Sequence, residues 1–171
     1  MHEQILLELF YYQPMSAFGV RELSRKTNLD TKTVMKYLRQ LISQRLVVRK
    51  KEPGHFPHYE ANRLSQLYRF EKSHSLIKKI LQTGLLYFLE KKCRPKTIVI
   101  IGSVQKGTYH RQSDIDLFVQ APYKKLNLAR FENSLGHKIS LLFESDMKTL
   151  NKGLIENIYN GEILFGKLEL P

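Results

Sequence analysis

One stretch, residues 97–120, constrains the fold of this chain more than any other. It opens on an apolar run at 98–101 that is β-branched throughout and stops at Gly102-Ser103. A short run of this kind, ended by glycine, is typical of a buried strand that delivers a turn to a surface. Ten residues separate Ser103 from Asp114, and a second apolar run follows. The pattern predicts a strand, a tight turn with a short helix, and a second strand.

Asp114 and Asp116 flank Ile115 at the start of the second strand. Because side chains alternate along a strand, the two carboxylates are expected on one face and Ile115 on the other. Such a pair suits a hard cation such as Mg²⁺, which can also hold the phosphates of a nucleotide. Gly102 lets the backbone approach a phosphate, and Ser103 adds a hydroxyl and an N–H near a helix start. The alternative is a structural α/β hairpin with a capped turn, which leaves the two acids unexplained.

With this spacing, the stretch resembles the minimal nucleotidyltransferases of the DNA polymerase beta superfamily. The resemblance implies that Gly102 and Ser103 bind the triphosphate of ATP, and that Asp114 and Asp116 hold Mg²⁺ at the catalytic centre. Lys106 stands before a glycine where the minimal enzymes carry Arg-Gly or Lys-Gly, and it joins the nucleotide-binding set. The ending at 156–166, ENIYNGEILFG, is also similar to the family's tail.

The family pattern places a third acid on the third strand, where it helps to deprotonate the attacking hydroxyl. In this chain that position falls on Ser140, which is neutral at pH 7 and cannot replace a carboxylate. Glu144 shares the face of Ser140 by strand parity, but it lies about 13 Å further along. The sequence therefore leaves open whether the nucleotidyltransferase domain is an active enzyme.

Helices are expected over residues 2–12, 20–27 and 31–44, the last with Asp30 as its N-cap. Strands are expected at 46–51 and 57–62, around a turn at Pro53-Gly54. This order resembles winged helix-turn-helix repressors. Seven basic residues and no acid lie between Lys32 and Lys51. The resemblance implies contacts to DNA through nine residues, namely Thr31, Lys32, Thr33, Lys36, Arg39, Arg49, Lys50, Lys51 and His55. A winged helix used only for dimerisation or protein contacts is the alternative.

The remaining pattern predicts a long helix over 63–92, interrupted around 73–75, and then a helix at 126–135 and a strand at 138–143. A helix from Asp146, its expected cap, to Tyr159 and a strand at 162–166 complete the chain. The fold class is therefore α+β: an N-terminal winged helix of three helices and a β-wing, a linking helix, and a small mixed sheet flanked by helices. The expected division is 1–65 for the winged helix, 66–95 for the linking helix and 96–171 for the nucleotidyltransferase domain.

Composition favours a partner that carries negative charge. The chain has 28 Lys and Arg against 16 Asp and Glu, for a formal net charge of +12. This balance favours nucleic acid first, although a solvated basic surface is the alternative. The single cysteine, Cys93, excludes an internal disulfide and fits a reducing compartment. Without an apolar run of membrane length or a signal peptide, a cytoplasmic protein that does not enter membranes is expected.

Two functions remain open from the sequence. The first is Mg²⁺-dependent transfer of AMP from ATP to a hydroxyl of a partner, such as a HEPN-type ribonuclease toxin, as the family suggests. The second is a DNA-binding regulator of transcription whose degenerate nucleotidyltransferase domain senses nucleotide or forms a homodimer. Histidines 55, 58, 110 and 137 show no metal-ligand spacing. His110 is expected at the surface, although it could approach the triphosphate.

Overall fold

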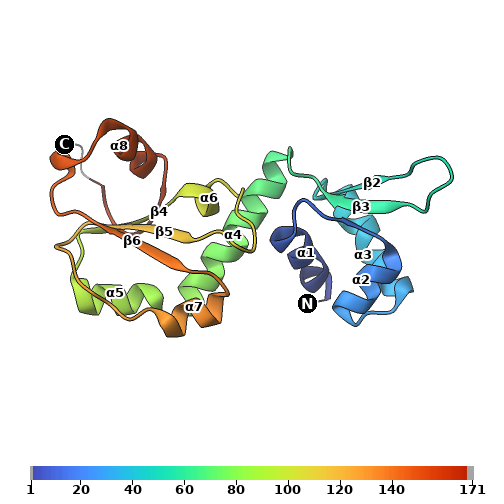
Figure 1. Ribbon diagram of the computed structural model, residues 1–171, viewed down its shortest axis with the longest axis horizontal. Helices are drawn as coiled ribbons and strands as arrows, with labels where there is room; N and C mark the ends of the chain where they lie inside the picture. The colour runs from blue at the N-terminus through green and yellow to red at the C-terminus, as the bar shows by residue number, and fades with distance from the viewer. Residues whose placement is uncertain (1, 169–171) are drawn as a thin grey trace. The chain divides into compact units, whose positions relative to one another are not determined.

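A computed structural model describes residues 2–168, and the chain divides into two compact units, residues 1–72 and 73–171. Figure 1 shows the order of the elements along the chain. Helix α4 (Gln66–Gln82) begins in the first unit and ends in the second. Each unit has its own cluster of buried apolar side chains, so each has its own core. The fold class is α+β, as predicted from the sequence.

The N-terminal unit combines three helices with a small antiparallel sheet. Its elements are α1 (His2–Tyr12), β1 (Ala17–Phe18), α2 (Val20–Thr27), α3 (Thr31–Ser43), β2 (Val47–Lys50) and β3 (His58–Ala61). The sheet order is β1-β3-β2, and the two-residue strand β1 was not predicted. This strand could not be predicted from the sequence, because two residues are too few to show an alternating pattern. Only its pairing with β3 defines it.

Helix α3 begins where the sequence predicted. The Asp30 carboxylate accepts a hydrogen bond from the Thr33 backbone N–H at 2.9 Å and another from the Thr33 hydroxyl at 2.6 Å. These bonds satisfy a backbone donor that the first turn leaves without a partner, which is the function of an N-cap. Val34, Leu38 and Leu41 are fully buried at helical spacing and anchor the helix to the core of the unit.

The predicted interruption of the long helix around 73–75 is wrong. Helix α4 runs without a break to Gln82, and α5 (Leu85–Cys93) follows after Thr83-Gly84. Ser73 is buried within α4, whereas Gly84 adopts a φ of 76°, a left-handed conformation that ends a helix. Glycine reaches this conformation without a steric penalty, so the break falls at the glycine instead of the polar cluster.

The C-terminal unit is built on a mixed four-stranded sheet of order β6-β5-β4-β7. Its further elements are β4 (Thr97–Ile101), α6 (Gly102–Gln105), β5 (Ile115–Val119), α7 (Ala129–Leu135), β6 (Ile139–Phe143), the 3-10 helix η1 (Met147–Thr149), α8 (Lys152–Tyr159) and β7 (Glu162–Gly166). β5 and β6 are parallel, and the other pairs are antiparallel. In Figure 1, α5 and α7 lie on one side of this sheet and α8 lies on the other.

Burial on both faces explains the apolar run of β4, whose five residues are all buried. Ile98 and Ile100 pack in one core cluster, and Val99 and Ile101 pack in a second cluster with Ile158 of α8. Side chains alternate across a strand, so a strand covered on both faces needs an unbroken apolar sequence. The predicted buried strand is therefore confirmed.

The single helix predicted from Asp146 to Tyr159 is wrong. Asp146 does cap a helix, since its carboxylate accepts the Lys148 N–H at 3.0 Å, but that helix is the short η1. The Asn151 side chain then accepts the Leu154 N–H at 2.9 Å and starts α8. Two capping residues lie five positions apart, and each begins its own helix because its side chain replaces a backbone partner.

Candidate nucleotide site

Gly102 joins β4 to α6 and lies against the carboxylate of Asp116. Its φ is +73°, and a Cβ at this position would stand 2.6 Å from Asp116 Oδ2. Any side chain here would meet both a backbone penalty and a collision with that oxygen. The sequence therefore needs glycine at this turn, and the turn is held in contact with one of the two candidate metal ligands.

Ser103 organises the loop that leaves the turn. Its carbonyl accepts backbone hydrogen bonds from Thr108 at 2.9 Å and from Tyr109 at 3.2 Å, so the chain folds back over α6. The Lys106 N–H donates to the Gly102 carbonyl at 3.3 Å, and the Lys106 side chain is exposed. The three residues predicted to bind nucleotide therefore belong to one hydrogen-bonded turn.

Asp114 and Asp116 form a crowded pair of negative charges. Asp116 is half-buried on β5, opposite Ile101 of β4, whereas Asp114 is exposed just before the strand. Partial burial raises the pKa of the Asp116 carboxyl, and the nearby Asp114 charge raises it further. A bound cation would relieve this repulsion, and two carboxylates with phosphate and water oxygens suit Mg²⁺.

His137 supports the loop that carries Asp114, a role that the sequence did not reveal. The His137 ring is 4% exposed, and its Nδ1 lies 2.8 Å from the Ser113 carbonyl, which requires the proton on Nδ1. Its ring also packs edge-on against Tyr109 at 5.7 Å. Only a tertiary contact places position 137 beside position 113, so neither spacing nor periodicity could have indicated it.

His110 shapes the same loop from within. Its backbone N–H donates to the Ser113 hydroxyl at 3.0 Å, and its Nδ1 accepts the Gln112 N–H at 3.2 Å. The side chain is exposed, as expected from the sequence. Both hydrogen bonds are local, so His110 fixes the approach to Asp114 through the backbone.

The structure places Ser140 beside Asp116, at the position where the resemblance calls for a third acid. The two residues are partners in the parallel register of β5 and β6, and Ser140 is exposed. Glu144 lies at the other end of β6, where its N–H donates to the Val119 carbonyl and its carboxylate accepts the N–H groups of Ser145 and Asp146. Within residues 2–168, no group of three His, Cys, Asp or Glu residues could together hold a metal.

A cavity of about 370 Å³ opens beside Asp114. Its other lining residues come from the preceding loop, from α7 and from the turn between α7 and β6, namely Arg111, Gln112, Ser113, Glu132, Asn133, Gly136, His137 and Lys138. Lys138 pairs with Glu132 at 3.2 Å, and Glu132 also accepts the Ile139 N–H at 3.0 Å. The cavity therefore adjoins the carboxylate pair on the side of β6 and has both charge signs in its wall.

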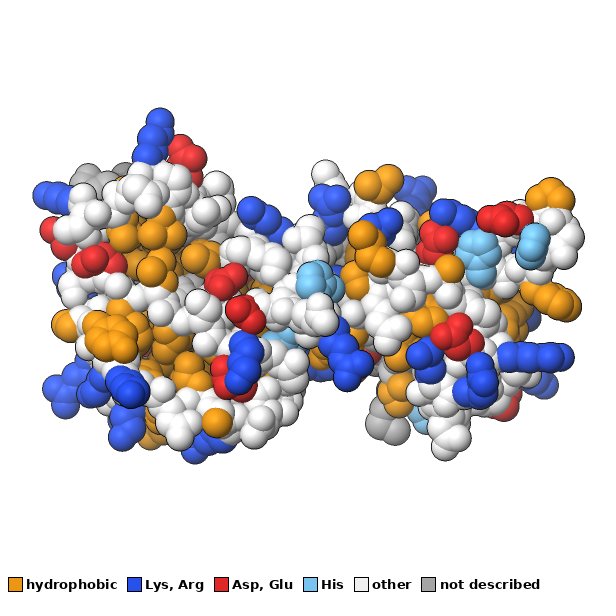
Figure 2. Space-filling model, viewed as in Figure 1, with side chains coloured by type: hydrophobic (Ala, Val, Ile, Leu, Met, Phe, Trp, Pro, Cys, Tyr) orange, Lys and Arg blue, Asp and Glu red, His pale blue; other side chains and the backbone are white. Residues whose placement is uncertain are grey.

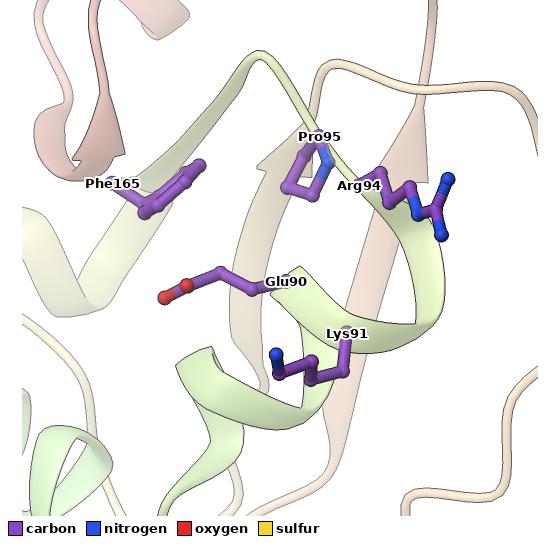
Figure 3. A pocket seen from close by; sticks show the side chains of 5 residues that line it. All are labelled: Glu90, Lys91, Arg94, Pro95 and Phe165. Atoms are coloured by element: carbon purple, nitrogen blue, oxygen red, sulfur yellow. The ribbon is translucent and has the colours of Figure 1, made fainter.

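A smaller hollow of about 310 Å³ lies at the end of α5 and is shown in Figure 3. It is lined by Glu90, Lys91, Arg94, Pro95 and Phe165. β4 starts just after this region and ends at Ile101, which pairs with Asp116, so the hollow and the carboxylate pair belong to opposite ends of the strand. The hollow is therefore separate from the candidate nucleotide site.

The residues predicted to contact DNA in the N-terminal unit are mostly exposed. Thr33 is the exception on α3, because its hydroxyl is engaged in the Asp30 cap. On β2, Lys50 pairs with Glu60 at 2.8 Å, so part of its charge is already neutralised. The other exposed members of the predicted set are Thr31, Lys32, Lys36, Arg39, Arg49, Lys51 and His55.

A mixed sheet that sets a Gly-Ser turn against the carboxylate of Asp116, with Asp114 nearby, is the arrangement of a nucleotidyltransferase-type domain. Residues 83–169, about half of the chain, match the family described as "Polymerase beta, Nucleotidyltransferase". The chain belongs to this family, and the matched segment contains the Gly-Ser turn and both aspartates. The C-terminal part of the predicted resemblance is thereby confirmed, whereas the winged helix stays a prediction.

No curated protein matches the chain. Among residues 2–168, no helix combines the length and the apolar character needed to cross a membrane.

Proposed function

We propose that residues 96–171 bind ATP together with Mg²⁺ and transfer its AMP group to a hydroxyl of a partner molecule. The observation that supports this proposal is the contact between Gly102, predicted to bind phosphate, and Asp116, predicted to bind the metal. Ser103 and Lys106 orient the triphosphate, and Asp114 and Asp116 hold the ion. Mg²⁺ supplies positive charge that stabilises the oxygens of the transferring phosphoryl group.

Transfer at this site is expected to be slow. The acceptor oxygen attacks the α-phosphorus, the bond to the β-phosphate breaks, and pyrophosphate leaves with the displaced electrons. The attacking hydroxyl must give its proton to solvent water, because Ser140 beside Asp116 cannot take it at neutral pH. General-base assistance typically contributes about 10²- to 10⁴-fold in rate. Positioning and electrostatic stabilisation therefore remain as the main sources of rate.

Replacing Ser140 by aspartate tests this account. Ser140→Asp restores a carboxylate opposite Asp116 and should raise the rate of label transfer from α-labelled ATP about 10²-fold or more. Ser140→Asn is the matched control, because it has similar size and no charge. Acceptors to assay include purified candidate protein partners, with a HEPN-type ribonuclease first. Absence of transfer by both the wild type and Ser140→Asp, at every Mg²⁺ and Mn²⁺ concentration, would count against the transferase proposal.

A second candidate function is a transcription regulator in which residues 1–65 form a winged helix that binds DNA. Exposed cations on α3, on β2 and at the start of the β2–β3 loop favour it, because seven basic residues and no acid occupy positions 32–51. In this alternative the nucleotidyltransferase domain is inactive and serves nucleotide sensing or homodimer formation. Mobility shifts on DNA from upstream of the protein's own gene test it, with binding that weakens steeply with salt as the expected result.

A further inference from the structure

Two segments that are far apart in sequence bring six exposed cations to one end of the C-terminal sheet. Four come from the end of α5 and the turn after it, and two come from the loop after β5. We call this the distal basic surface, and its residues are Lys91, Lys92, Arg94, Lys96, Lys124 and Lys125. The Lys124 Nζ donates to the Lys92 carbonyl at 2.7 Å, and the Lys96 N–H donates to the Gln120 carbonyl at 2.9 Å.

Apart from Glu90, no acid lies close to these charges in the sequence. Segments 91–113 and 120–131 contain no Asp or Glu. Among residues 2–168, no carboxylate lies within ion-pair distance of the six cations. Glu90 is adjacent in sequence, but Figure 3 shows the Arg94 guanidinium directed away from the Glu90 carboxylate. Figure 2 shows Lys and Arg side chains gathered on the side of the C-terminal unit where α5 lies. Like charges held together by tertiary contacts attract a polyanion.

Two exposed aromatic rings accompany the cations. Tyr87 is 65% exposed one helical turn before Lys91, whose Nζ lies 5.4 Å from the ring centroid. Tyr123 is 79% exposed next to Lys124, and its ring is supported edge-on by Phe143 at 5.8 Å. Exposed tyrosines among cations allow bases to stack while the phosphates are neutralised, which is how proteins bind single strands. A duplex or a lipid headgroup offers no unstacked base to these rings.

The distal basic surface is separate from the candidate nucleotide site. β4 begins at Thr97, next to Lys96, and ends at Ile101, next to Gly102. Four steps along a strand correspond to about 13 Å, so the surface cannot be the triphosphate-binding part of that site. It also belongs to a different unit from the basic residues of α3. A ligand at this surface would therefore contact residues other than those of the candidate nucleotide site and those of α3.

We propose that the distal basic surface binds single-stranded nucleic acid, with its lysines on the phosphates and Tyr123 stacked on a base. Fluorescence anisotropy with the full chain and labelled 20-nucleotide oligo(U) and oligo(dT) tests it over a salt series. In the triple variant Lys91→Gln/Lys92→Gln/Lys125→Gln, the slope of log affinity against log salt concentration should become shallower by about 2. Each phosphate contact to a single strand contributes roughly 0.7 to this slope. The affinity of this variant at low salt should fall at least about tenfold.

The matched control is Lys26→Gln/Lys148→Gln/Lys152→Gln, which removes the same charge from other exposed positions and should bind like the wild type. Tyr123→Ala should weaken binding about tenfold, and Tyr123→Phe should retain it, because the ring stacks and the hydroxyl does not. Thermal unfolding of each variant checks that it folds. Equal binding by the two triple variants overturns the proposal. A second result would also overturn it. In that case, Tyr123→Ala binds the oligonucleotides as the wild type does, and the protein binds phosphatidylserine vesicles only when the three lysines are present.

Discussion

The two units hold their candidate binding residues in opposite ways. In the N-terminal unit, Lys32, Lys36 and Arg39 project from a helix whose stability comes from its buried side. In the C-terminal unit, Gly102 and Asp116 are in contact with each other and with the sheet. Charged side chains on an exposed helix face should contribute to binding almost independently. Residues that contact each other in one site should lose binding together when either is replaced. Substitutions on α3 should therefore have graded effects, whereas substitutions at Gly102 or Asp116 should abolish the function of the whole site.

The largest effect is expected from Asp116→Asn. Loss of a metal ligand should lower the affinity for ATP with Mg²⁺ more than about 100-fold, since changes one step further from a metal already cost 10- to 100-fold. Isothermal titration calorimetry measures this directly. An affinity within a few fold of the wild type would show that the carboxylate pair does not hold the ion.

The same substitution should stabilise the fold in a pH-dependent way. The pKa of Asp116 is raised by burial and by Asp114, so its ionised form is less favourable in the folded state than in the unfolded state. The wild type therefore loses stability as pH rises through the range where Asp116 ionises, and Asp116→Asn does not. Urea unfolding should show the variant to be more stable at pH 8, with the difference vanishing at acidic pH. If the stability of the two proteins depended on pH in the same way, Asp114 and Asp116 would not destabilise each other as proposed.

Gly102→Ala should have the next largest effect. The new Cβ displaces the Asp116 carboxylate, so the affinity for ATP with Mg²⁺ should fall about 10- to 100-fold. Gly84→Ala is the matched control, because Gly84 also has a positive φ but no atom within 4 Å of the added Cβ. Both variants carry a backbone penalty of about 1–2 kcal/mol, which thermal unfolding measures. Equal affinities of the two variants would mean that the turn and the carboxylate act independently.

Smaller and additive effects are expected on α3. Lys36→Gln and Arg39→Gln should each reduce the slope of log affinity for duplex DNA against log salt by about 0.9, and together by about 1.8. Mobility shifts at several salt concentrations measure these slopes. Lys152→Gln serves as the control for loss of one positive charge elsewhere. If Lys36→Gln and Arg39→Gln together abolished DNA binding, the cations of α3 would not act independently and the two units would not differ in this respect.

The smallest effect is expected from Asp30→Ala, which removes the cap of α3. Hydrogen bonds from the Thr33 side chain and backbone hold the pKa of Asp30 below its usual value. The cap therefore stabilises the fold above the ordinary pKa of an aspartate, and this contribution is lost as pH falls through the lowered pKa. The wild type should have a higher melting temperature than Asp30→Ala at pH 7, and the two melting temperatures should converge in acid. A difference that persists in acid would assign the effect to helix propensity.

What the sequence could predict depended on how local the cause was. The β-branched run of β4 and the Asp30 cap are local signals, and both were predicted correctly. The break at Gly84 was misplaced because the polar cluster at 73–75 resembles a loop in sequence, whereas Ser73 is buried inside α4. His137 and the contact between Gly102 and Asp116 arise from tertiary packing, which no periodicity records. The family of the C-terminal unit could be predicted because its motif, the Gly-Ser turn followed by the two aspartates, lies on elements that are adjacent in sequence.

The central claim is that the Gly102 turn and the two aspartates form one site for ATP and Mg²⁺. The most direct measurement is a calorimetric titration of ATP into the full chain, with and without Mg²⁺, repeated with Asp116→Asn. We expect one site per chain in the wild type, binding that requires Mg²⁺, and loss of this binding in the variant. Binding that is equally strong without Mg²⁺ or with Asp116→Asn, or no binding at all, would contradict it.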